Sequence, residues 1–267
     1  MKKVVYTLAL EGYPNEMTDL TFPWIEHYAN KIGASFFVIK KQKFPDWPPT
    51  FEKHQIWELG KNVDWNIFID ADALINPELF DVTAVVPKDT VVFTGQDMAA
   101  MRFRPNKYML RDGRYIGACS WFVVSSDWTH DLWRPPTEDG ATIEQLKKNI
   151  FPTNGERQCR VGDGSHGISA EKLIEDYTLS SNIARFGLKH TTIEGHIKQR
   201  FGRMYDAYYW HQYTITIDEK IIQCLNVMKA WGLVTPAIEE KFGSYIKKLE
   251  AQPLGQPGPQ MPMRPPC

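Results

Sequence analysis

The sequence predicts an α/β protein whose mostly parallel central sheet is flanked by helices. Two observations support this fold class. Over the first 95 residues, short apolar runs alternate with longer amphipathic segments, an order typical of βαβ units with parallel strands. In addition, one apolar run ends in two aspartates, Asp70 and Asp72, and ligands bind beyond the carboxyl ends of the strands in such sheets.

The first part of the chain is expected to supply most of the parallel sheet. Gly33 follows the first amphipathic segment and suits a helix C-cap, because glycine readily adopts the left-handed conformation. The loop 11–15 ends the first strand and should open onto the same sheet edge as Asp70. The expected strands are 4–10, 35–39, 65–69 and 90–94, and the expected helices are 18–31 and 50–61.

The second part should be less regular, with a small antiparallel region. A polar, basic loop (96–114) and a glycine-rich irregular segment (155–167) are expected near the site. A helix over 168–186 should begin at Ser169 as N-cap and end at Gly187 as C-cap. The remaining expected elements are strands 115–125, 188–193 and 208–214 and helices 127–133, 218–231 and 236–249.

Composition excludes several classes of protein. The 267 residues carry a formal net charge of −1, which gives no reason to expect nucleic acid as a partner. The four cysteines form no C-x-x-C pair, so we expect reduced thiols in a cytoplasmic protein. No apolar run approaches the ~20 residues needed for a transmembrane segment. Residues 1–250 should form one domain, and the Pro- and Gly-rich segment 251–267 is expected to be a disordered tail.

The segment Asp70-Ala71-Asp72 allows two interpretations. If strand geometry continues across Ala71, both carboxylates lie on one face, and a cation such as Mg²⁺ or Mn²⁺ would relieve their repulsion. Small Ala71 would leave room for a ligand beside the backbone. Alternatively, the segment is a strand-end turn in which Asp72 caps the local backbone.

The stretch FEKHQIWELGKNVDWNIFIDADALINP (51–77) resembles the metal-binding core of GT-A fold glycosyltransferases, most closely the retaining galactosyl- and glucosyltransferase-like families. The resemblance implies a Rossmann-like GT-A fold, with residues 1–95 as the nucleotide-binding half and 96–250 as the acceptor-side half. It also implies that Asp70 and Asp72 bind Mn²⁺ (or Mg²⁺), and that Asp70, Ala71 and Asp72 bind the nucleotide-sugar donor. Lys53 occupies the place of a basic donor-binding residue, and Tyr13 that of the aromatic residue beside the nucleobase.

Further roles follow from the same resemblance. His211, within YWHQY, matches the third metal ligand, with His190 and His196 as lesser alternatives. Lys198 could contact phosphate. Glu175 and Asp176 match the carboxylate near the reacting sugar, and because adjacent helix residues diverge by about 100°, only one of them is expected to face the site. The segment 116–118 (IGA) replaces the family's usual N-x-G, so it lacks the asparagine that would make a polar contact.

The resemblance therefore implies a metal-dependent hexosyltransferase that uses a nucleotide-sugar donor, UDP-linked, and a carbohydrate or other hydroxyl-bearing acceptor, with retention of configuration. Two alternatives remain open. In a haloacid-dehalogenase-like phosphatase, Asp70 would be the nucleophile and Asp72 the general acid, but Leu74 and the two preceding strands do not fit that family's pattern. A nucleotide-sugar or carbohydrate binder would keep the fold without the chemistry.

Overall fold

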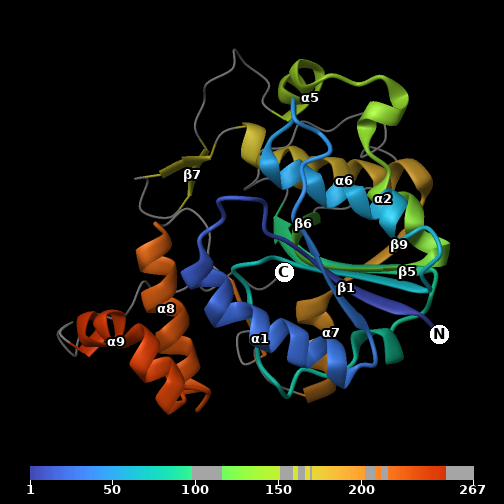
Figure 1. Ribbon diagram of the computed structural model, residues 1–267. Helices are drawn as coiled ribbons and strands as arrows, with labels where there is room; N and C mark the ends of the chain where they lie inside the picture. The colour runs from blue at the N-terminus through green and yellow to red at the C-terminus, as the bar shows by residue number, and fades with distance from the viewer. Residues whose placement is uncertain are drawn as a thin grey trace.

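A six-stranded mixed sheet forms the centre of the molecule (Figure 1), in the order β2-β1-β3-β6-β5-β9. The computed structural model describes residues 1–97, 116–150, 159–161, 166–168, 170–201, 208–211 and 216–250. β1 pairs parallel with β2 and β3, and β5 pairs parallel with β9, whereas β6 runs antiparallel to β3 and β5. The sheet strands are β1 (Lys3–Leu8), β2 (Ser35–Ile39), β3 (Trp65–Ile69), β5 (Thr90–Asp97), β6 (Ile116–Ser126) and β9 (Lys189–Thr192).

Helices cover both faces of this sheet because its central strands are apolar on both sides. All five residues of β3 are buried, and this continuous apolar run is typical of a strand covered on both faces. α1 (Asn15–Lys31) and α7 (Ile193–Phe201) pack on one face. α6 (Ile174–Phe186) packs on the other, together with α2 (Ile56–Leu59) and the 3₁₀ helix Asp127–Trp133. The predicted α/β class and mostly parallel sheet are confirmed.

A helical hairpin lies beside this sandwich. α8 (Ile217–Ala230) and α9 (Pro236–Glu250) contact each other, and α8 packs against α1 (Figure 1). Their shared core includes Leu20 of α1, Leu225 of α8 and Phe242 of α9. Thr216 caps α8 in a capping box with Glu219. A contact between Lys220 and Asp72 places the start of this helix near the carboxyl edge of β3. No described helix is both long and apolar enough to cross a membrane.

Short elements complete the described fold. β4 (Leu74–Ile75) pairs antiparallel with β10 (Tyr209–Trp210), and β7 (Cys159–Val161) pairs antiparallel with β8 (His166–Ile168). Neither β4, α7 nor α5 (Ile143–Ile150) was expected. The 3₁₀ helices are Pro49–Gln55, Val82–Ala84, Asp127–Trp133, Pro136–Asp139 and Ala170–Leu173.

Several local predictions need correction. The segment 50–61 begins as the 3₁₀ helix Pro49–Gln55 and becomes α-helical only at Ile56. α6 begins at Ile174 instead of residue 168, because β8 and a 3₁₀ turn occupy the preceding residues, although Gly187 is the left-handed C-cap as predicted (φ 63°). The supposedly irregular segment 155–167 contributes to the β7–β8 pair. Ser169, most of the loop 96–114 and the tail 251–267 lie outside the described residues.

Candidate active site

The two aspartates lie in a tight turn, not in a continuing strand. β3 ends at Ile69, and the amide of Ala73 donates to the carbonyl of Asp70 at 3.0 Å to close the turn before β4. The amide of Asp70 donates to the carbonyl of Trp121 in β6 at 2.9 Å. The two carboxylates therefore converge through a turn, and the expectation that a continuing strand would place them on one face was wrong. The alternative in which Asp72 only caps local backbone is also not what the contacts show, since its carboxylate faces other elements.

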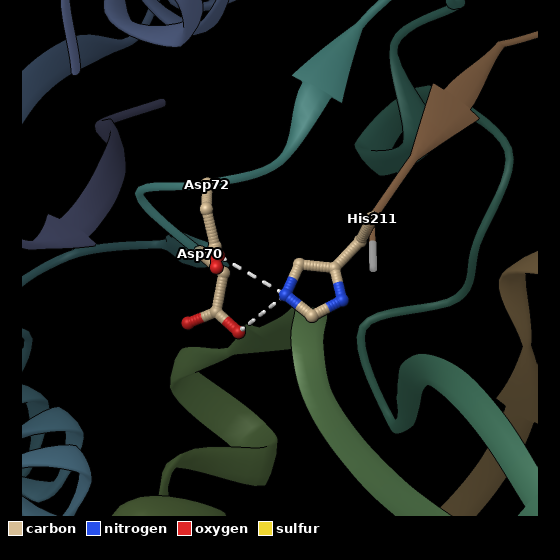
Figure 2. Close-up of side chains that lie close together, drawn as sticks. All are labelled: Asp70, Asp72 and His211. Carbon is tan, nitrogen blue, oxygen red and sulfur yellow. Dashed lines mark hydrogen bonds and ion pairs between the residues drawn. The ribbon is translucent and has the colours of Figure 1, made fainter. Parts of the chain in front are cut away.

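His211 joins this turn to form a cluster of three possible metal ligands (Figure 2). Its Nε2 lies 3.0 Å from Oδ1 of Asp72 and 3.5 Å from Oδ2 of Asp70. One ligand atom from each residue can be chosen so that all lie within 4.8 Å of one another. The β4–β10 pair aligns Trp210 with Leu74, directly after the turn, and so delivers His211 to the aspartates.

This donor set fits a divalent cation. Two carboxylates and an imidazole suit Mn²⁺, and the carboxylates alone suit Mg²⁺. The imidazole stacks on the indole of Trp121 at 4.5 Å between ring centroids, so packing orients Nε2 toward the carboxylates. Nδ1 of His211 is buried without a hydrogen-bond partner among the described residues.

Lys220 is a member of the site that sequence reasoning missed. It lies in the first part of α8, and its ammonium forms an ion pair with Asp72. Burial alone would raise the pKa of Asp72, but His211 and Lys220 hold it well below its usual range. Asp72 is therefore ionised at neutral pH. A lysine near a helix start carries no distinctive sequence signal, which explains why it was not identified.

Lys53 is enclosed beneath the turn. Its side chain is 4% exposed, and Nζ lies 2.9 Å from Oδ1 of Asp70 and 2.8 Å from Oγ of Ser120, to which it donates. Oε1 of Glu175 is 3.9 Å away. Burial would lower the pKa of Lys53, but the surrounding carboxylates of Asp70, Glu175 and Asp176 raise it above the ordinary value. The Lys53 ammonium is thus protonated at neutral pH and forms an ion pair with Asp70.

Both members of the acidic pair on α6 are buried near Lys53, whose pKa their charges raise. The expectation that only one of them faces the reacting sugar stays a prediction. They occupy the first turn of α6, which contacts β6 and the 3₁₀ helix Pro49–Gln55. The Thr50 hydroxyl donates to Glu175 at 2.9 Å, and the Ser120 amide donates to Asp176 at 2.8 Å. The two carboxylates therefore bond to different neighbouring elements, in keeping with their divergence on the helix.

The acidic pair is perturbed in its protonation. Burial raises the pKa of Glu175 to about 8 and that of Asp176 to about 6, although Lys53 opposes both shifts. Burial thus favours the protonated form of both carboxyl groups, against the opposing charge of Lys53. Neighbouring carboxyl groups with raised pKa values are frequent in active sites.

Two further predicted residues differ in their relation to the site. Tyr13 is half-buried in the loop after β1, and its pKa is raised by burial and by the charges of Asp72 and Asp70. Lys198 is exposed on α7, and no described hydrogen bond or ion pair joins it to the aspartates.

The remaining expectations concern histidines and loops. His190 lies on β9 at the far edge of the sheet, where its ring stacks on Phe93, and His196 lies on α7. Neither belongs to the described ligand cluster. The segment 116–118 begins β6, and there the Ala118 amide donates to Ser180. The basic residues of the 102–114 loop and residues 162–165 lie outside the described part of the chain.

Comparison with known proteins identifies the fold. No family model and no curated protein matches the chain. A solved glycosyltransferase involved in the glycosylation of the major capsid of PBCV-1 is 11% identical, with a TM-score of 0.50 over 85% of this chain and 100% of that one. Galactosyltransferase LgtC in complex with donor and acceptor sugar analogues is 11% identical, with a TM-score of 0.45 over 91% and 99% of the two chains.

A third solved structure, a Drosophila β-1,4-galactosyltransferase 7 in complex with manganese, UDP-Gal and xylobiose, is 11% identical, with a TM-score of 0.39 over 83% of this chain and 79% of that one. The likeness to the PBCV-1 enzyme shows that this chain has the GT-A fold. At this level of identity the comparison establishes the fold, and the reaction must be argued from the site.

Proposed function

We propose that this chain is a metal-dependent hexosyltransferase. It moves a sugar from a nucleotide-diphosphate sugar to a hydroxyl group of a carbohydrate or other acceptor. The observation that carries the proposal is the convergence of Asp70, Asp72 and His211 at the carboxyl edge of β3 in a GT-A fold. The resemblance of the segment 51–77 to retaining enzymes supplies the choice of UDP as carrier and of retention at the anomeric carbon.

In this proposal the donor diphosphate lies against the turn. Asp70, Asp72 and His211 would hold Mn²⁺ or Mg²⁺, and the bound cation would neutralise the charge that develops on the departing diphosphate. Lys220 already contacts Asp72 and brings a second positive charge to the same place. Tyr13, on the loop after β1, offers its ring to the nucleobase. Ala71 has a small side chain and keeps the turn free of bulk between the two aspartates.

The sugar would lie toward the α6 end of the same site. As the bond between the sugar and the diphosphate breaks, positive charge develops on the sugar ring. Asp176 and Glu175 would stabilise that charge and orient the acceptor hydroxyl, with Lys53 beside Glu175 and the Ser120 amide bonded to Asp176. The acceptor oxygen forms the new bond at the anomeric carbon, and its proton passes to the departing phosphate oxygen.

The phosphatase hypothesis loses support from the fold. In that family the nucleophilic aspartate follows the first strand, whereas Asp70 follows β3, with β1 and β2 before it in the chain. The likeness to the PBCV-1 glycosyltransferase also points to the GT-A fold.

Calorimetric titration with UDP, with and without Mn²⁺, tests the proposal. We expect metal-dependent binding, followed by slow hydrolysis or transfer when UDP-, GDP- and CDP-sugars are screened against a panel of acceptors. Failure to bind any nucleoside diphosphate in the presence of Mn²⁺ would refute the proposal. Metal-dependent binding without hydrolysis or transfer would instead indicate a nucleotide-sugar binder, and phosphate release from p-nitrophenyl phosphate that is lost in Asp70→Asn would indicate a phosphatase.

A further inference from the structure

Side chains of α1 hold the chain segment that follows β3. Four hydrogen bonds run from α1 to backbone carbonyls between residues 71 and 80. Tyr28 donates to Phe80, and Lys31 donates to Pro77 and Leu79, at distances between 2.6 and 3.3 Å. Thr21 donates to Ala71 at 2.5 Å. α1 therefore holds the segment 71–80 through these side chains. Of the three donors, Thr21 is the one that bonds to the turn carrying Asp70 and Asp72.

The Thr21 hydroxyl has two possible acceptors, one in the turn after β3 and one in its own helix. Its Oγ1 lies 2.5 Å from the carbonyl oxygen of Ala71 and 3.0 Å from that of Met17, one turn earlier in α1. Both partners are acceptors, and a hydroxyl has a single proton to donate. The contact with Ala71 is the shorter one, and the Thr21 side chain is fully buried. The hydroxyl therefore donates into the middle of the Asp-Ala-Asp turn.

This bond fixes the peptide group between the two aspartates. The C=O and N–H groups of a trans peptide point in opposite directions. Once the Ala71 carbonyl points toward α1, the N–H of Asp72 points away from it, and the backbone dihedral that precedes the Asp72 side chain is restricted. Because Asp70 and Asp72 lie in a turn and not in a continuous strand, the relative orientation of their carboxylates then depends on α1.

We propose that Thr21 is a positioning residue for the metal site, which orders the turn so that Asp70 and Asp72 face one cation together. The inference rests on the metal site of the proposed function and concerns residues that do not touch the ligand themselves. Removing residues that orient metal ligands typically weakens metal binding by about 10- to 100-fold. A merely structural threonine would lower stability without changing metal affinity.

The experiment compares the metal-free protein and its Mn²⁺ complex in four forms: wild type, Thr21→Val, Thr21→Ser and Tyr28→Phe. Thr21→Val is isosteric and removes only the hydroxyl donor. Thr21→Ser restores that donor. Tyr28→Phe is the matched control, because it removes a buried hydroxyl of α1 that donates to the same segment, at Phe80, away from the metal turn. Thr21→Ala replaces Thr21→Val if the valine variant does not fold.

We expect Thr21→Val to raise the dissociation constant for Mn²⁺, measured by electron paramagnetic resonance, about 10-fold. Thr21→Ser and Tyr28→Phe should remain near the wild-type value. In the metal-free protein, hydrogen exchange of the peptide 70–75 should accelerate in Thr21→Val but not in Tyr28→Phe. Wild-type Mn²⁺ affinity together with unchanged exchange in Thr21→Val would overturn this proposal and leave the proposed function intact.

The other outcomes separate the two proposals. If the wild-type protein does not bind Mn²⁺, the metal site itself is wrong, and both proposals fail. If wild type binds Mn²⁺ and Thr21→Val binds it weakly, but no donor is hydrolysed or transferred, the proposed reaction fails while the positioning role of Thr21 stands.

Discussion

Replacing Lys220 with methionine should strengthen Mn²⁺ binding to the nucleotide-free protein. The Lys220 ammonium forms an ion pair with Asp72, and the two side chains are only 14% and 12% exposed. A cation held by Asp70, Asp72 and His211 requires the same carboxylate, so the ammonium must first move away or share it. Methionine removes the charge and keeps a flexible chain of similar length.

The size of the effect follows from the strength of the contact that metal binding must break. A hydrogen bond to a charged group contributes about 1.5–3 kcal/mol, and partial exposure favours the lower end of that range. About 1.4 kcal/mol corresponds to a tenfold change in an equilibrium constant, so Lys220→Met should lower the dissociation constant for Mn²⁺ about tenfold. With saturating Mn²⁺ present, the same variant should bind UDP more weakly, because the ammonium is no longer available to the diphosphate.

Calorimetric titrations with Mn²⁺ alone, and with UDP at saturating Mn²⁺, measure both effects at one ionic strength. Lys241→Met is the matched control: it removes a lysine of the same helical hairpin, which pairs with Asp19 of α1 at 2.8 Å on an exposed surface. That variant should bind Mn²⁺ like wild type. Unchanged or weaker Mn²⁺ binding by Lys220→Met would show that the ammonium does not compete with the cation.

Three further predictions address other parts of the site. Asp72→Asn should abolish Mn²⁺-dependent turnover while the far-ultraviolet circular dichroism spectrum stays that of wild type, with exposed Asp131→Asn as control; full activity would contradict the metal assignment. Burial raises the pKa of Glu175 from 4.5 to about 8, so its contribution to the stability of the metal-free protein falls as the pH rises through that window. Glu175→Gln lacks this loss. Its free energy of unfolding in urea, relative to wild type, should therefore increase as the pH rises from about 5 to about 8. A difference between the two proteins that does not change with pH would argue against the raised pKa of Glu175. Tyr13→Leu should weaken UDP binding by about 10-fold, as loss of stacking on a base costs about 1–3 kcal/mol; unchanged affinity would place the base elsewhere.

The predictable part of the fold depends on local patterns. The strands 35–39 and 65–69 were predicted with their observed bounds, because short apolar runs between turn residues indicate strands directly. A small antiparallel part was expected in the second half of the chain, but not that β6 would run antiparallel between β3 and β5 within the central sheet. Strand direction depends on which distant strands pair, and the periodicity of a single strand contains no information about its neighbours.

The residues of the site also fall into those that the sequence could identify and those that it could not. The residues Asp70, Asp72 and His211 could be selected from the sequence because their side-chain chemistry suits a divalent cation and their context resembles a known motif. Ser120 and Thr50 could not, since hydroxyl side chains are common and their relevance appears only when Lys53 and Glu175 lie beside them. Roles that depend on burial, such as the raised pKa values of the acidic pair, also require the packed structure.

The sequence by itself thus determined the kinds of ligand atom available and the strand after which they occur. Only the tertiary structure decided that a turn, supported by α1 through Thr21, brings the two aspartates together. It also decided that β10 delivers His211 and that α8 delivers Lys220 to the same carboxylate. The physical reason is that chemical identity belongs to single residues, whereas convergence within hydrogen-bond distance depends on pairing and packing between segments up to 148 positions apart in the chain.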